Sequence, residues 1–168
     1  MAKEIERKFL VNPSKLPAER YGDEYKQGYL SITDTGVTRI RIIGDRGFLT
    51  IKSKTIDITR DEYEYEIPFK DAARLIKLSQ GKIIHKTRTR VVHDGKEWEI
   101  DEFHGDNKGL WLAEIELVDS KESFSKPEWV LDEVSDDQIR GLGAKIGERA
   151  SPQDVDLSLM VLAYDHSI

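Results

Sequence analysis

The chain has 168 residues, a length typical of one domain whose core is large enough to be stable without disulfides. It has no cysteine, which excludes disulfides, thiolate metal sites and a cysteine nucleophile. The net charge of -6, from 26 basic and 32 acidic residues, argues against nucleic-acid binding through a basic surface. Since neither a leader pattern nor a long apolar run is present, we expect a cytoplasmic protein that does not contact a membrane.

The first predicted strand, within residues 4–11, places three charged side chains at alternate positions. In a strand, Glu4, Glu6 and Lys8 share one face. Carboxylate oxygens suit Mg²⁺ or Mn²⁺, and a lysine can contact an anion that the metal bridges. This face therefore predicts phosphoryl chemistry.

Five later segments alternate in the same way, and each carries charge of a single sign on one face. Strands in water usually mix signs, because like charges side by side repel. We therefore expect acidic and basic strands to face each other inside a closed or nearly closed sheet that forms a polar tunnel. A structural sheet with its charges in water is the alternative. The basic faces carry Arg39 and Arg41, Lys52 and Lys54, and Lys86, Arg88 and Arg90, and the acidic faces carry Glu62, Glu64 and Glu66, and Glu114 and Glu116.

Turns and helices complete the predicted outline. Glycine-containing turns at 34–36, 44–47 and 94–95 join successive strands as antiparallel hairpins. An amphipathic helix is predicted over 70–80, where Gly81 follows.

Three further segments have weaker patterns. A short helix is predicted within 13–20 and a loop over 125–130. Ser151-Pro152 predicts the start of a helix that leads into 155–164.

Other catalytic patterns are missing from the sequence. The four histidines are dispersed without metal-ligand spacing, and neither a phosphate-binding glycine loop nor a G-x-S-x-G motif occurs. Phosphate binding must therefore come from side chains.

The charged segments resemble the CYTH superfamily, the triphosphate tunnel metalloenzymes, and in particular its short bacterial inorganic triphosphatases. Residues 4–8 carry the ExExK signature of that family, and residues 27–30 read QGYL. The basic and acidic strands follow in the family's order, so the likeness covers roughly residues 3–135.

The resemblance implies an α+β fold that is mainly antiparallel β. We expect a closed eight-stranded β-barrel that forms a tunnel, with helices packed outside. Residues 1–168 would form one domain, with the barrel over roughly 3–135 and a helical segment over roughly 136–168. That segment matches no pattern of the family, and a helix in it can plug one tunnel mouth, pack outside or join a homodimer.

The resemblance also implies a role for each charged residue. Glu4 and Lys86 would take part in proton transfer, and Tyr29 would position water or phosphate, unless it is a core tyrosine. The residues implied to bind phosphate are Lys8, Arg39, Arg41, Lys52, Lys86 and Arg88, and those implied to bind Mg²⁺ or Mn²⁺ are Glu6, Glu62, Glu64, Glu114 and Glu116.

The implied reaction is hydrolysis of a small-molecule triphosphate, with tripolyphosphate giving pyrophosphate and phosphate. Thiamine triphosphate, nucleoside triphosphates and adenylate cyclisation are alternatives within the family. A polyphosphate- or nucleotide-binding module without catalysis is an alternative outside it.

Overall fold

The computed structural model describes residues 2–134. The predictions for the C-terminal segment, including a helix over 155–164, lie outside the described residues.

Antiparallel strands make up most of the described chain. One α-helix, α1 (Phe69–Leu75), and three short 3-10 helices, η1 (Pro13–Lys15), η2 (Ile76–Leu78) and η3 (Gly105–Asn107), lie among them. The strands are β1 (Ala2–Val11), β2 (Gly22–Thr33), β3 (Gly36–Ile43), β4 (Arg46–Ser53), β5 (Thr59–Ile67), β6 (Ile84–His93), β7 (Lys96–Phe103), β8 (Trp111–Glu116) and β9 (Val130–Glu133).

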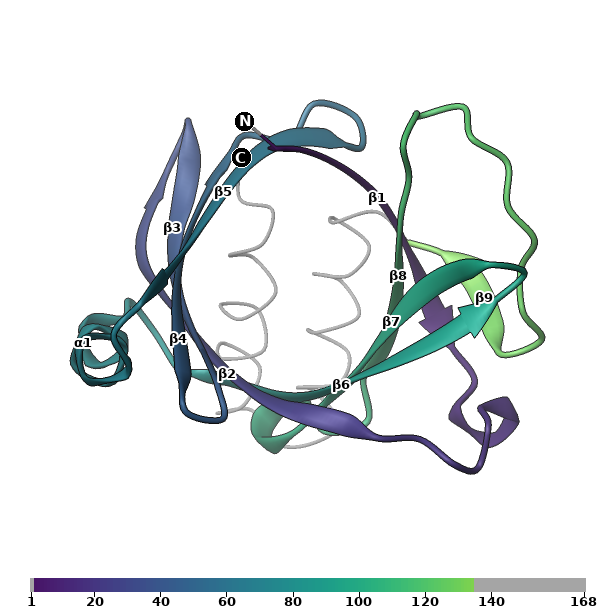
Figure 1. Ribbon diagram of the computed structural model, residues 1–168, viewed down its shortest axis with the longest axis horizontal. Coiled ribbons are helices and arrows are strands. Elements are labelled where there is room, and N and C mark those ends of the chain that lie inside the picture. Colours follow the sequence, from purple (N-terminus) through teal and green to yellow (C-terminus); the bar gives the residue numbers. More distant parts are fainter. Residues whose placement is uncertain (1, 135–168) are drawn as a thin grey trace.

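Eight strands form a closed ring in the order β5-β4-β3-β2-β6-β7-β8-β1 (Figure 1). The ring closes where β1 pairs with β5, from Ala2 opposite Glu62 to Ile5 opposite Thr59. Farther along β1, where β5 no longer pairs with it, β9 pairs with the same edge of β1 at Phe9 and Val11. The expected closed antiparallel sheet of eight strands is confirmed.

The predicted hairpins join neighbouring strands of this ring. Between β6 and β7, Asp94 and Gly95 both have positive φ, 49° and 73°. Two consecutive residues with positive φ make the tight turn whose twist matches that of paired strands.

The interior of the ring changes from charged to apolar toward one end. Residues two positions apart in a strand share a face. Leu10 therefore points inward like Lys8, and Ile84 points inward like Lys86. The buried cluster at this end comes from β2, β3, β6, β7 and β8 and from the segments next to β8 and β9, and consists of Tyr29, Val37, Ile84, Phe103, Leu110, Leu112 and Val134.

A second cluster lies outside the ring, where α1 covers β3 and β4. Ile40 is fully buried against Ala72 and Ile76. The approach is close, since a Cβ added to Gly47 would lie 2.3 Å from the Ala72 Cβ. Glycine at this position therefore lets the helix rest on the sheet.

Both predicted helices before residue 81 are shorter than expected. The 70–80 helix ends as α1 at Leu75 and continues only as η2, because the backbone turns extended at Ser79. Within 13–20 only η1 forms, since Leu16 is extended and precedes Pro17, whose ring disfavours a helical residue before it.

Residue Lys54 lies just beyond the end of β4 at Ser53, where its backbone N–H donates to the Thr35 carbonyl.

The expected loop over 125–130 is present up to Val130, where β9 begins. Through the described residues, no helix has the length and apolar character needed to cross a membrane.

Two isoleucines on neighbouring strands test the role of α1. Ile40→Ala should lower the free energy of unfolding by about 2–5 kcal/mol, because it leaves a cavity under the helix. Ile51 is 43% exposed, so Ile51→Ala removes the same atoms with an expected loss below about 1 kcal/mol. Urea denaturation measures both changes, and equal losses would contradict the packing of α1 over Ile40.

Candidate functional site

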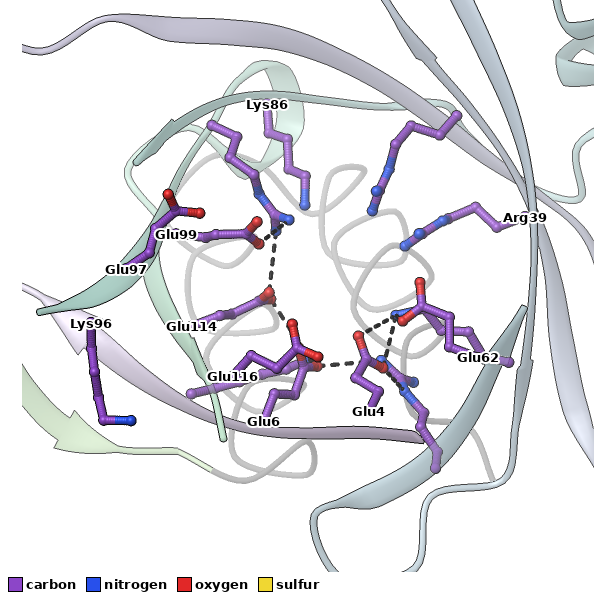
Figure 2. Close-up of a pocket in the computed structure, with 15 residues that line it drawn as sticks. Glu4, Glu6, Arg39, Glu62, Lys86, Lys96, Glu97, Glu99, Glu114 and Glu116 are labelled. Atoms are coloured by element: carbon purple, nitrogen blue, oxygen red, sulfur yellow. Dashed lines mark hydrogen bonds and ion pairs between the residues drawn. The ribbon is translucent and has the colours of Figure 1, made fainter. Parts of the chain in front are cut away.

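The charged inner faces enclose a cavity of about 330 Å³. In Figure 2 the carboxylates of Glu4, Glu6 and Glu114 follow one side of the cavity, and Lys86 and Arg39 lie across from them. The predicted residues that line it are Glu4, Glu6, Lys8, Arg39, Arg41, Lys52, Glu62, Lys86, Arg88, Glu114 and Glu116.

Strand register brings the acidic side chains together. Because β1 pairs with β8, Glu6 lies opposite Glu116 and Lys8 lies opposite Glu114. On its other edge β1 pairs with β5, which places Arg60 opposite Glu4. Directly opposite side chains on one face are neighbours, so three strands contribute to one acidic side of the cavity.

Residue Glu4 is held by two cations. Its Oε2 accepts a hydrogen bond from Arg60 Nε at 2.6 Å, and Lys52 Nζ lies 3.3 Å from the same oxygen. Burial first, and then repulsion from Arg39 and Arg60, lowers the pKa of Lys52. The contacts with Arg60 and Lys52 fix the Glu4 carboxylate in place.

The ammonium group of Lys8 lies between two carboxylates. Its Nζ is 3.4 Å from Glu6 Oε1 and 3.9 Å from Glu114 Oε1. Burial and then the charge of Glu114 raise the pKa of Glu6. Burial alone would also raise the pKa of Glu114, but Arg88 and Lys8 outweigh it and lower that pKa to about 2.

Unlike these glutamates, Glu116 has no cation within ion-pair distance in the part of the chain that the structure describes. Burial, and then repulsion from Glu4 and Glu6, raises its pKa. The acidic side therefore holds negative charge that the neighbouring side chains leave unbalanced around Glu116.

On the basic side, Asp101 joins Lys86 and Arg88. Asp101 is 1% exposed, and its oxygens accept from Lys86 Nζ at 2.8 Å and from Arg88 Nε and a terminal nitrogen at 2.7 Å each. Burial, followed by the charge of Arg88, lowers the pKa of Lys86 to about 8, although Asp101 opposes the shift. Burial would raise the pKa of Asp101, but the charges and hydrogen bonds of Arg88 and Lys86 outweigh it and hold that pKa well below its ordinary value.

Arg39 and Arg41 extend the basic side along β3. Burial, then repulsion from Arg39 and Arg88, lowers the pKa of Arg41 to about 10. The Nε of Arg41 is buried without a hydrogen-bond partner among residues 2–134. Such a donor suits an oxygen-rich anion, because an unsatisfied buried N–H is costly.

Two predicted site residues do not line the cavity. Glu64 lies at its edge, 3.8 Å and 3.7 Å from the nearest nitrogens of Arg39 and Arg41, and accepts from Thr50 Oγ1 at 2.8 Å. Tyr29 is 1% exposed and belongs to the apolar cluster inside the ring. This position matches the core tyrosine that was its alternative.

Sequence reasoning missed several charged residues of the site. Arg60 precedes the predicted acidic segment and was outside it, although β5 already begins at Thr59. Glu97, Glu99 and Asp101 alternate along β7 and form a third acidic strand that the period-two pattern could have revealed. Lys96, at the start of β7, also lines the cavity but pairs with Glu122, away from the other labelled groups in Figure 2.

The donor set fits a divalent cation. Throughout residues 2–134 no three acidic or histidine side chains are already gathered to hold a metal ion, and Glu4, Glu6 and Glu114 pair with cations instead. Carboxylate oxygens are nevertheless the donors that Mg²⁺ and Mn²⁺ prefer. Burial and then repulsion between carboxylates raise the pKa values of Glu6 and Glu116, and a cation near them would relieve that repulsion.

The Lys86–Asp101 contact predicts a measurable titration. The ε carbon of Lys86, followed by NMR, should titrate with a midpoint of about 8. Asp101→Asn should move the midpoint lower still, because it removes the negative charge that favours the ammonium form. A midpoint near 10.5 in the unchanged protein would contradict the burial of Lys86.

Comparison with known proteins agrees with this geometry. Residues 2–149 match the family model described as CYTH domain. The chain is 41% identical over 138 residues to an inorganic triphosphatase of Acetivibrio thermocellus, covering 82% of this chain and 88% of that protein. It is 36% identical over 140 residues to an inorganic triphosphatase of Nitrosomonas europaea, covering 80% of this chain and 91% of that protein. A solved structure of an inorganic triphosphatase superposes with a TM-score of 0.58 at 34% identity, covering 82% of this chain and 90% of that chain. The chain belongs to the CYTH family.

Proposed function

We propose that this protein hydrolyses inorganic tripolyphosphate to pyrophosphate and phosphate with the help of a divalent cation. The observation that carries the proposal is the division of one enclosed cavity into a basic and an acidic side. The relatives named inorganic triphosphatase, at 41% and 36% identity, support the choice of substrate. A cytoplasmic location remains a prediction.

The basic side supplies the contacts for the phosphate chain. Arg39, Arg41 and Arg88 carry guanidinium groups, which match phosphate oxygens in shape and charge. Their side chains are buried or nearly so, so the charges are weakly screened and already in place before the substrate enters. Lys86 adds an ammonium donor on this side, and Lys8 and Lys52 add two more beside the carboxylates of the acidic side.

Residues on the acidic side would hold the cation. Glu6, Glu114 and Glu116 are the proposed ligands on β1 and β8, and Glu62 and Glu64 support them from β5. A bound Mg²⁺ or Mn²⁺ would act as a Lewis acid on the phosphate oxygens. Glu4 lies beside these proposed ligands, and its hydrogen bonds with Arg60 and Lys52 fix its position.

Proton transfer is assigned to Lys86 and Glu4. A pKa of about 8 leaves Lys86 mostly charged at neutral pH, yet able to exchange its proton readily. Glu4 lies across the cavity as a fixed carboxylate that can accept a hydrogen bond from the attacking water.

The proposal is tested by phosphate release from four substrates in parallel: tripolyphosphate, ATP, thiamine triphosphate and pyrophosphate. Each is assayed with Mg²⁺, with Mn²⁺ and with a chelator. We expect metal-dependent release chiefly from tripolyphosphate. Formation of cyclic AMP from ATP would replace the proposal by a cyclase, and tight tripolyphosphate binding without release would leave a binding module.

Glu116→Gln separates catalysis from binding. Because it removes a charge from the proposed cation site, kcat should fall by about a hundredfold or more. Binding of tripolyphosphate without metal should be retained, because the basic side is unchanged; isothermal titration calorimetry measures it. Glu24→Gln, at an exposed position near the start of β2, is the matched control and should leave both values unchanged. Equal kcat for the two variants would remove Glu116 from the cation site.

A further inference from the structure

The side chain of Tyr25 lies behind the cations that form the basic side of the cavity, and it does not line the cavity itself. Tyr25 is on β2, between β3 and β6, and is paired directly with Lys86. It therefore shares the inward face of the sheet with that lysine. With 3% of its surface exposed, it is covered by its neighbours and does not line the cavity.

Four cationic side chains contact this one tyrosine. The Cζ atoms of Arg41 and Arg88 lie 5.2 Å and 5.5 Å from the ring centroid, and Lys86 Nζ lies 5.8 Å from it. Distances of this order allow a cation to be attracted by the face of an aromatic ring. On its edge, the Tyr25 hydroxyl accepts a hydrogen bond from a terminal nitrogen of Arg90 at 3.2 Å.

These cations repel one another, and the carboxylates paired with them within residues 2–134 do not join all of them. Asp101 accepts from Lys86 and Arg88. Arg41 comes from β3, and its acidic neighbour is Glu64, on β5. The ring of Tyr25 touches Arg41 as well as Lys86 and Arg88 of β6, and Tyr25 lies on β2, the strand between β3 and β6.

We propose that Tyr25 is a positioning residue for triphosphate binding. Its ring holds Arg41, Lys86 and Arg88 at fixed separations across the β3–β2–β6 part of the cavity, so that their charges are ready for a phosphate chain. Tyr25 acts only through these three side chains, since it does not reach the substrate. This inference rests on the proposed function.

Removal of the ring should affect binding of the substrate more than its turnover. In Tyr25→Leu the three cations lose their shared contact, so we expect KM for tripolyphosphate to rise about tenfold. In Tyr25→Phe the ring is kept and only the bond to Arg90 is lost, so KM should stay within about twofold of the unchanged protein. A purely structural role would instead reduce the folded fraction, which lowers the apparent kcat and leaves KM unchanged.

The experiment measures kcat and KM for the two variants and for Tyr65→Leu, together with their thermal unfolding. Tyr65 is 57% exposed on β5, so its change to leucine is a matched control that should leave KM unaltered. A raised KM in Tyr25→Leu that Tyr25→Phe restores supports the proposal. An unchanged KM in a folded Tyr25→Leu protein, or an equal rise in Tyr25→Phe, overturns it.

Calorimetric binding of tripolyphosphate to the same proteins, without metal, separates this inference from the proposed function. If the unchanged protein binds tripolyphosphate without hydrolysing it, the proposed reaction fails, and Kd replaces KM in judging Tyr25 by the same criteria. If the unchanged protein neither binds nor hydrolyses it, both the proposed function and the role of Tyr25 are overturned.

Discussion

The pairing of β1 with β5 is the contact on which the rest of this structure depends, because it closes the sheet into a ring. In an open sheet the charged faces would lie in water, where ion pairs contribute little to stability. Closure brings Glu4 and Lys52 together inside the enclosed space, 3.3 Å apart. Charges withdrawn from water must be balanced by each other or by a ligand.

That balance is uneven along the cavity, and the unevenness is what suits it to a charged ligand. Asp101 neutralises part of the basic side at Lys86 and Arg88. Arg41, whose pKa is lowered to about 10, and Glu116, whose pKa is raised, retain charge that is not fully compensated. An anion beside Arg41 and a cation beside Glu116 would balance both charges. A binding site for such a pair explains charges of both signs in one cavity better than a structural sheet with its charges in water does.

The two ends of the interior have different tasks. Toward one end, inward side chains such as Phe103, Leu112 and Val134 form an apolar cluster that supplies hydrophobic stabilisation. Val134 takes part because the chain continues from β9 along β1, where β5 no longer pairs. The charged part can therefore serve binding, while the apolar part and the exterior packing under α1 hold the ring together.

The sequence by itself determined the charged inward faces of β1, β3, β4, β5, β6 and β8, because a period of two residues is a local property of the chain. It therefore predicted Glu6, Arg39 and the other lining residues that share those faces. Tertiary structure decided what depends on pairing between distant strands: Arg60 bonds to Glu4, and Tyr29 lies in the apolar cluster rather than in the cavity. Register and ring closure arise from contacts between residues far apart in sequence, so a pattern read within one segment contains no record of them.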